Sequence, residues 1–294
     1  MSEHASTDGL SEERYMTFNL NKNLALTALG AFLAFSSLSP CSAQAAELER
    51  VKQHGEINIG ASYNTPVLGY QDSITREFSG FEIDLAREVA KRLGVQANFV
   101  PVSTSDRFEK LEAGIVDVLM SHVTITDERK QKFDFTDAYY QDVVSVLVKN
   151  DSQINELKDL LDKRLVVVND STSAQALVEE LKARKLISAD NYVSKTFDAY
   201  SWTEGVTFAL CADNKVALKY LDDDKVAGFV EDYTVLLNYK DKNRKFIKDN
   251  FCPQPYGIVG MKGEDLIPEL NRIIGELVRD GTVERLKKQH QLTF

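Results

Sequence analysis

Polar side chains follow two short apolar runs of the chain, at points where a folded strand would end. Asp232 comes directly after the run at residues 226–230, and Ser171 and Thr172 come after the run at residues 165–168. Free backbone N–H groups at the start of a helix favour an anion, and Asp, Ser and Thr are also common helix caps. These two strand ends therefore indicate either a site for a charged ligand or ordinary helix capping.

Arg129 lies in the stretch VDVLMSHVTITDERKQKFDFTDAYY at residues 116–140. Its guanidinium offers a planar fork that can bind a carboxylate through two parallel hydrogen bonds, which lysine cannot imitate. On these residues alone, a solvated helix arginine beside Asp127 and Glu128 is the simpler interpretation.

The residue patterns of common cofactor and metal sites are missing from the sequence. It contains no nucleophile elbow, phosphate-binding loop or dinucleotide fingerprint. The histidines are too scattered to form a ligand cluster: His4, His54, His122 and His290. We therefore expect no cofactor and no metal.

The elements that would position the polar residues alternate between strands and helices. In GFEIDLAREVAKRLG at residues 80–94, apolar residues recur at every fourth position, which predicts an amphipathic helix ended by Gly94. Strands are expected at residues 57–60, 95–102, 116–120, 143–148, 165–168, 192–196, 226–230 and 256–261. Helices are expected at residues 106–113, 172–184, 215–221, 266–279 and 283–290. This alternation predicts sheets with parallel pairs and covering helices.

The strand–helix pattern runs twice, with breaks near Asn150 and Pro253. We predict an α/β fold of two lobes joined by two strands, with a cleft between them that suits a small ligand. The expected divisions are a leader at residues 1–45, lobe 1 at 46–148, lobe 2 at 149–253, and a return to lobe 1 at 254–294.

The leader has the features of a secretory signal peptide. Residues 24–38 are apolar, and a cleavage site of small residues ends at Ala45. We therefore predict a periplasmic protein, with Met16 as an alternative start because residues 1–15 are acidic. A proline before Cys41 disfavours a lipid anchor.

Composition and charge narrow the class of partner. The chain is 43% hydrophobic and 27% charged, as in globular proteins, and its net charge is −10. Residues 1–45 hold four acids and two bases, so residues 46–294 carry −8, which argues against nucleic acid as a partner. Cys211 and Cys252 remain after the leader, either as a disulfide or as two buried thiols.

Residues 80–94 and 116–140 together resemble the polar amino-acid-binding family of extracellular solute-binding proteins, the capture subunits of ABC importers. The resemblance extends over most of residues 47–292, with Ala138 where a proline is usual. It implies a type II periplasmic-binding-protein fold with two hinge strands and the ligand in the interlobe cleft. It also implies a monomer that captures an amino acid, does no chemistry on it, and delivers it to a membrane permease.

The resemblance assigns roles to individual residues. Arg129 would grip the α-carboxylate of the ligand, and Asp232 would take the α-ammonium group. Thr172 would contact the carboxylate from the second lobe, in a turn where Asp170 replaces the usual glycine. Further hydroxyl or backbone contacts would come from Thr124 and Ser121. Glu231 is interpreted as a charge at the start of a helix.

The side-chain end of the pocket is predicted from Arg107, which aspartate- and glutamate-binding members also carry. A buried Arg107 would neutralise a second carboxylate, and the alternative is a solvated arginine paired with Glu109 or Glu112. Ser62 offers neither the carboxylate typical for basic ligands nor the cation typical for acidic ones.

His122 stands where a small residue is usual and would supply a donor or a pH-dependent positive charge, unless it is a core histidine. Pocket-wall candidates are Tyr63, Asn64 and Tyr256.

We therefore expect capture of aspartate or glutamate, with a neutral ligand such as cysteine, cystine or glutamine as the alternative. An enzyme resembling the cyclohexadienyl dehydratases would need a general acid in the second lobe, and only Asp232 has a clear position there. A sensory domain is less favoured because no membrane span or signalling module follows before Phe294. Residues 202–224 form a segment longer than in the relatives, and the acidic run at 222–224 indicates a solvated turn.

Overall fold

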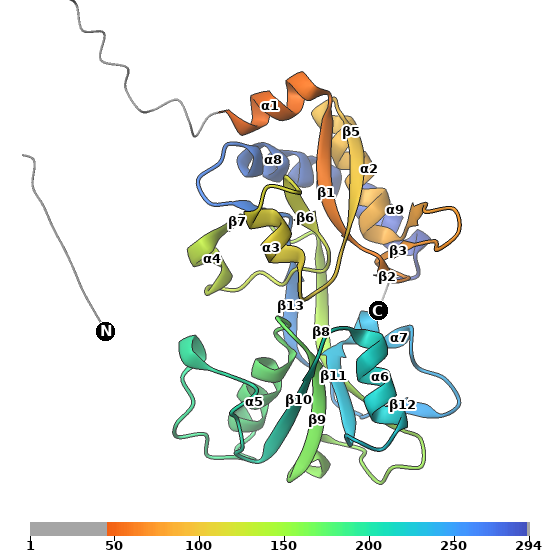
Figure 1. Cartoon of the computed structure of the whole chain (residues 1–294), viewed down its shortest axis with the longest axis vertical. Helices are drawn as coiled ribbons and strands as arrows, with labels where there is room; N and C mark the ends of the chain where they lie inside the picture. The colour runs from red at the N-terminus through yellow and green to blue at the C-terminus, as the bar shows by residue number, and fades with distance from the viewer. Residues whose placement is uncertain (1–45, 293–294) are drawn as a thin grey trace, which may run out of the picture. The chain divides into compact units, whose positions relative to one another are not determined.

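The structure, a computed structural model, describes residues 46–292 (Figure 1). The predicted leader, with Met16 and Cys41, lies outside the described residues. Among residues 46–292, no helix combines the length and apolar character that crossing a membrane would require.

The first sheet is built from both ends of the described chain. Its strand order is β5 (Gln96–Val102), β1 (Glu56–Ser62), β6 (Val118–Met120), β14 (Val259–Met261) and β7 (Phe133–Phe135). Strand β1 is parallel to β5 and β6, whereas β14 is antiparallel to β6 and β7. A small antiparallel sheet of β2 (Asn64–Thr65), β3 (Gly69–Gln71) and β4 (Phe78–Ser79) lies beside it.

The helices around the first sheet bury one apolar core. These helices are α1 (Glu47–His54), α2 (Phe81–Leu93), α8 (Leu266–Arg279) and α9 (Thr282–Gln289). Their core residues include Phe81, Leu85, Val89 and Leu93, the four positions of the predicted amphipathic face. The helical prediction for this segment is therefore confirmed. Two short helices, α3 (Arg107–Glu112) and α4 (Arg129–Lys132), carry the arginines considered above.

The second sheet has the order β10 (Val206–Cys211), β9 (Lys163–Val168), β11 (Gly228–Asp232), β8 (Tyr140–Lys149) and β12 (Arg244–Phe246). Strand β13 (Phe251–Tyr256) also pairs with β8. Helices α5 (Ser173–Ala183), α6 (Asn214–Asp222) and α7 (Tyr233–Leu237) pack against this sheet, and short 3₁₀ turns span Leu157–Leu160 and Ser194–Thr196. Because β9, β10 and β11 are parallel, their carboxyl ends meet at one edge.

Two antiparallel strands connect the sheets. Strands β8 and β13 run side by side between them in Figure 1, with Tyr140 opposite Tyr256 in the register. This is the two-lobed α/β architecture expected from the sequence. The lobe boundaries after residues 148 and 253 stay a prediction.

Two predicted strands are wrong. Residues 192–196 form no strand, because Tyr192, Phe197 and Trp202 pack their rings against one another, and the strand beside β9 is β10 instead. Residues 256–261 do not form one strand, because Gly257 and Ile258 separate β13 from β14, which belong to different sheets.

The two cysteines of the described chain are free thiols and do not form the disulfide. Burial raises the pKa of both thiols, Cys211 and Cys252, to about 11, so both stay protonated at neutral pH. The acidic run at residues 222–224 ends α6, and its carboxylates pair with the basic residues Arg244, Lys219, Lys225 and Lys149.

Candidate functional site

The candidate site lies where the carboxyl ends of strands in the two sheets face each other. Arg129 joins the two sides, since its Nη1 donates to the carbonyl of Thr124 at 2.9 Å and its Nη2 donates to the carbonyl of Asp170 at 2.9 Å. Within residues 46–292, Arg129 forms no ion pair with a carboxylate. A guanidinium that bonds only to carbonyls can accept an anionic ligand as a further partner.

Buried polar atoms without a hydrogen-bond partner occur in the segments on both sides of this arginine. Among the described residues they include Ser121 Oγ and His122 Nδ1 from one side, and Ser171 Oγ and Asp232 Oδ1 from the other. Further such atoms are Glu82 Oε2, Arg107 Nε and Ser145 Oγ. Most buried polar atoms in folded proteins have partners, so orphans converging from two sides are typical of a ligand site.

Asp232 is the N-terminal flanking residue of α7, yet its side chain makes no capping hydrogen bond. Instead its Oδ2 accepts a hydrogen bond from the Tyr256 hydroxyl at 2.5 Å, which leaves Oδ1 unpartnered. The capping alternative for this residue is therefore wrong. Burial, followed by the nearby Glu231 and Asp142 carboxylates, raises the pKa of Asp232 well above its usual range.

The pKa of Arg129 is lowered by its surroundings. Burial, and then repulsion from the Arg107 guanidinium, lower the pKa of Arg129 to about 9, while Asp232 acts in the opposite direction. Arg129 is still charged at neutral pH. Arg129 is half-buried, and its guanidinium donates to the Thr124 and Asp170 carbonyls rather than pairing with Asp127 or Glu128.

Arg107 is a buried residue, only 2% exposed, and pairs with neither Glu109 nor Glu112. Its Nη1 donates to the carbonyls of Ser121 and His122 at 2.7 and 3.4 Å, and its Nε is unpartnered. The solvated alternative is therefore wrong. Arg107 holds the loop that carries Ser121 and His122, and one of its donors is still available.

His122 does not supply a positive charge. Burial, then repulsion from Arg107 and Arg129, hold the pKa of His122 well below its usual value, so the imidazole is neutral. Its backbone adopts a left-handed conformation with φ 41°, and its N–H donates to Glu82 Oε1 at 2.7 Å. A neutral ring with an unpartnered Nδ1 can offer a hydrogen bond but no charge.

The turn before α5 places Thr172 beside a hinge strand. Its hydroxyl donates to Gln254 Oε1 on β13 at 2.8 Å and does not cap the helix. Asp170 adopts φ 60°, the left-handed conformation that explains why a glycine suits this turn and why Asp is tolerated.

Thr124 is brought to the site, and the contacts of Ser62 and Tyr63 lie within the first lobe. Thr124 forms a β-bridge with Tyr256 and accepts from Arg129 through its carbonyl. Ser62 Oγ lies 3.0 Å from the Thr65 hydroxyl and is fully buried. Tyr63 packs against the small apolar cluster containing Phe78.

Three buried carboxyl groups were not expected from the sequence. Glu82 on α2 accepts from Tyr139 Oη at 2.6 Å as well as from His122, and burial raises its pKa to about 7. Asp142 lies on hinge strand β8. Glu231 is buried in β11, where burial raises its pKa to about 7, so its interpretation as a helix-start charge is wrong. A charged residue within an apolar strand was the available signal for Asp142 and Glu231.

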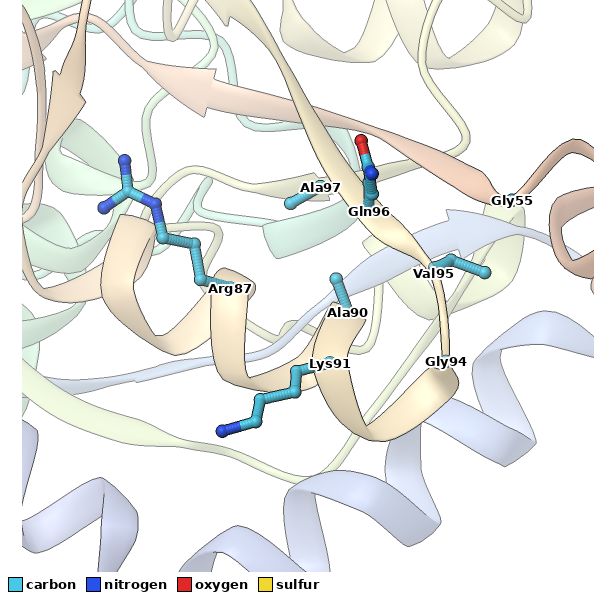
Figure 2. Close-up of a pocket in the computed structure, with 8 residues that line it drawn as sticks. All are labelled: Gly55, Arg87, Ala90, Lys91, Gly94, Val95, Gln96 and Ala97. Carbon is cyan, nitrogen blue, oxygen red and sulfur yellow. The ribbon is translucent and has the colours of Figure 1, made fainter.

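A separate depression of about 600 Å³ lies at the carboxyl end of α2 (Figure 2). Arg87 and Lys91 line it together with the turn at Gly94, and none of the predicted site residues reaches it. No group of His, Cys, Asp and Glu in residues 46–292 could hold a metal ion.

The two-lobed fold, with polar groups converging between its lobes, defines the class of periplasmic-type binding proteins. Residues 57–293 match the bacterial extracellular solute-binding proteins, family 3, and the chain belongs to this family.

Individual relatives agree with this assignment. The ABC transporter glutamine-binding protein GlnH of Bacillus subtilis (strain 168) is 28% identical over 247 residues, covering 82% of this chain and 83% of that protein. The L-cystine-binding protein TcyJ of Escherichia coli (strain K12) is 27% identical, covering 82% and 85%. The structure of an ancestral arginine-binding protein bound to arginine is 29% identical with a TM-score of 0.66, covering 80% of this chain and 97% of that one.

Proposed function

We propose that the chain captures one free α-amino acid between its lobes and delivers it unchanged to the permease of an ABC importer. Within the described part of the chain, Arg129 has no ion-pair partner and unpartnered polar atoms lie on both sides of it, and this observation carries the proposal. A zwitterion would supply an anion to Arg129 through its carboxylate and a hydrogen-bond donor to Asp232 Oδ1 through its ammonium group. The relatives are named as proteins that bind glutamine or cystine, and this supports an amino acid as the ligand.

The proposal is tested by substituting Arg129 and measuring binding of the common amino acids by calorimetry. Arg129→Ala should weaken binding about 30-fold or more, because truncating one partner of a buried charge pair costs about 2–5 kcal/mol. Arg129→Lys keeps the charge but loses the fork, so we expect an intermediate loss. Arg285→Ala on the exposed face of α9 is the control. Unchanged affinity in Arg129→Ala would rule out this site.

For the side chain of the ligand, we propose an acidic group, as in aspartate or glutamate. Support comes from Arg107, a buried cation close to the site with an unpartnered Nε. Burial is the first cause that lowers the pKa of Arg107, and a second ligand carboxylate would offset that cost.

A neutral ligand is favoured by a different property of the same residue. Arg107 already donates to two backbone carbonyls, and the acids Glu231, Asp232 and Glu82 lie near enough to balance its charge. Arg107→Ala separates the two ligand classes. If the acidic ligand is correct, the variant should lose far more affinity for glutamate than for glutamine. The ratio of the two losses cancels any structural damage that affects both ligands equally. Equal losses would assign Arg107 to the scaffold alone.

The enzyme alternative gains one observation, because Glu231 is a buried acid of the second lobe with a pKa of about 7. Such a group could donate a proton to a leaving group in an elimination. Mass spectrometry of the small molecule that co-purifies with the protein tests this alternative. An unchanged amino acid supports capture, whereas a dehydrated product supports catalysis.

We further propose a periplasmic monomer released by cleavage after residue 45. The apolar leader and the family support this location. N-terminal sequencing of the exported protein tests the cleavage site, and a start other than Ala46 would contradict it.

A further inference from the structure

Three buried groups meet where the hinge strands reach the site. Asp142 lies on β8, Tyr256 lies on β13, and Asp232 ends β11, with exposed fractions of 3%, 0% and 4%. The Tyr256 hydroxyl oxygen is 3.0 Å from Asp142 Oδ2 and 2.5 Å from Asp232 Oδ2. One phenol therefore touches two carboxyl groups.

A phenol has one hydrogen and can direct it at only one of these oxygens. If both carboxyl groups were ionised, Tyr256 could donate to only one of them. Its oxygen would then face a carboxylate oxygen of the other with no hydrogen between the two acceptors. In a buried place such a contact is costly. The geometry therefore requires one more proton than two carboxylates and a phenol provide.

The extra proton belongs on Asp232. Asp142 accepts from the backbone N–H groups of Val143 and Thr234 at 2.8 and 3.2 Å, which stabilise its ionised form. Asp232 accepts no such capping bond, and its Oδ1 has no partner. A protonated Asp232 can donate to the Tyr256 oxygen, and Tyr256 can then donate to Asp142.

The surrounding charges act on this proton in both directions. Burial comes first among the causes that raise the pKa of Asp232 and of Asp142. Ionisable groups that influence Asp232 come from β8, β11, β13, α3 and α4: Asp142, Tyr140, Glu231, Tyr256, Cys252, Arg107 and Arg129. The acids favour keeping the proton, and the two arginines oppose it.

We propose that Asp232 holds this proton in the ligand-free protein and that the ammonium group of the ligand expels it. The inference rests on the proposed function, since it assumes an amino acid at Asp232. On binding, the O–H bond of Asp232 breaks and the proton passes to the buffer. The ammonium group then donates to Oδ1 and Tyr256 turns its hydrogen to Oδ2, so the contact of Tyr256 with Asp142, now without a hydrogen, has to lengthen in the ligand-bound protein. Asp142 and Tyr256 act as positioning residues that set the proton affinity of the ammonium-binding group.

The experiment is calorimetry with L-glutamine and L-glutamate in two buffers of different ionisation heat, since the difference in heat counts the protons released. At a pH below the pKa of Asp232 in the ligand-free protein, the wild-type protein should release close to one proton per ligand. Its affinity should fall about tenfold for each pH unit below the pKa of Asp232 in the ligand-free protein, because binding then competes with protonation.

Asp142→Asn removes one of the two carboxylates, so Asp232 should ionise more easily and the released proton should be largely lost. Asp117→Asn is the matched control, because Asp117 is a buried carboxylate bonded to Arg50 and the Asn58 N–H, away from the hinge. It should release the same number of protons as the wild type. A loss of fold alone would not change proton release in this selective way.

The outcomes separate the two proposals. Binding with the same heat in both buffers would overturn the shared proton and leave the capture function standing. Absence of binding with every amino acid would overturn the capture function. The protonation of Asp232 is then measured in the ligand-free protein. In the ligand-free protein with labelled aspartate carboxyl carbons, the resonance missing from Asp232→Asn should titrate well above the ordinary range. Titration in the ordinary range would overturn the inference.

Discussion

At the scale of single residues, two guanidinium groups share one aromatic ring. Those of Arg107 and Arg129 lie 5.4 and 5.1 Å from the centre of the Phe108 ring. The arrangement stabilises both cations while keeping them close, and their repulsion contributes to the lowered pKa of Arg129. Under the proposed function, a ligand carboxylate at Arg129 would relieve this repulsion.

The buried Glu82 predicts how stability depends on pH. Burial raises its pKa from about 4.5 to about 7, so between these values the folded state binds more protons than the unfolded state. Unfolding free energy should therefore fall as pH rises through this window, by up to about 3 kcal/mol from this group. Glu82→Gln should lose that part of the slope, because an amide oxygen can still accept from His122 N–H and Tyr139 Oη. Urea unfolding at about pH 5 and pH 8 measures it.

Glu49→Gln is the control for this measurement, because Glu49 is exposed on α1 and should leave the slope unchanged. An identical slope in Glu82→Gln and the wild type would mean that Glu82 is ionised throughout the window, contrary to the expected effect of its burial.

The sequence could predict which residues might bind the ligand backbone, but not the groups that tune them. Arg129 and Asp232 stand at recognisable places in two motifs, and the structure brings both to the site. Glu82 lies in a helix whose charged positions normally face water, so its burial depends on a loop about 40 residues away. Likewise, the contact of Tyr256 with Asp142 depends on the pairing of two distant strands.

At the scale of elements, predictions succeeded where periodicity was strong and failed where aromatic residues packed locally. Helix α2 follows its four-residue apolar repeat. Residues 192–196 have strand-like composition, but they end in the 3₁₀ turn Ser194–Thr196, beside the ring cluster of Tyr192, Phe197 and Trp202. Propensity alone could not reveal this, because the ring partners of Tyr192, which are Phe197 and Trp202, lie outside the segment.

The two ends of α2 give a paired prediction. Gly80 precedes the helix with φ 125°, and an added Cβ would lie 2.3 Å from the Leu68 carbonyl oxygen, which is backbone and cannot easily move. Gly94 ends the helix with φ 84° and has open space around it. Gly94→Ala should cost about 1 kcal/mol of unfolding free energy, as for a left-handed cap, and Gly80→Ala clearly more. Denaturant unfolding of both variants measures this, and equal losses would contradict the predicted backbone clash.

At the scale of the whole molecule, the lobes touch through a few polar bonds besides the hinge strands. Arg129 reaches the Asp170 carbonyl, and Ser105 Oγ donates to the Ala212 carbonyl at 3.2 Å. The Tyr239 hydroxyl donates to the Asn64 carbonyl at 3.3 Å. The sequence predicts a hinge from the two connecting strands. It does not predict these hydrogen bonds between the lobes, because they join loops that are far apart in the sequence.

The last prediction concerns motion about β8 and β13. If the lobes close on the ligand, saturating amino acid should reduce the radius of gyration measured by small-angle scattering. Ser105→Ala removes a bond that forms only when the lobes meet, so it should weaken binding about twofold to tenfold, as for one hydrogen bond. Ser188→Ala is the control, because the Ser188 hydroxyl donates to Asp190 in its own loop. An unchanged radius together with wild-type affinity in Ser105→Ala would mean that the lobes are already held together before the ligand binds.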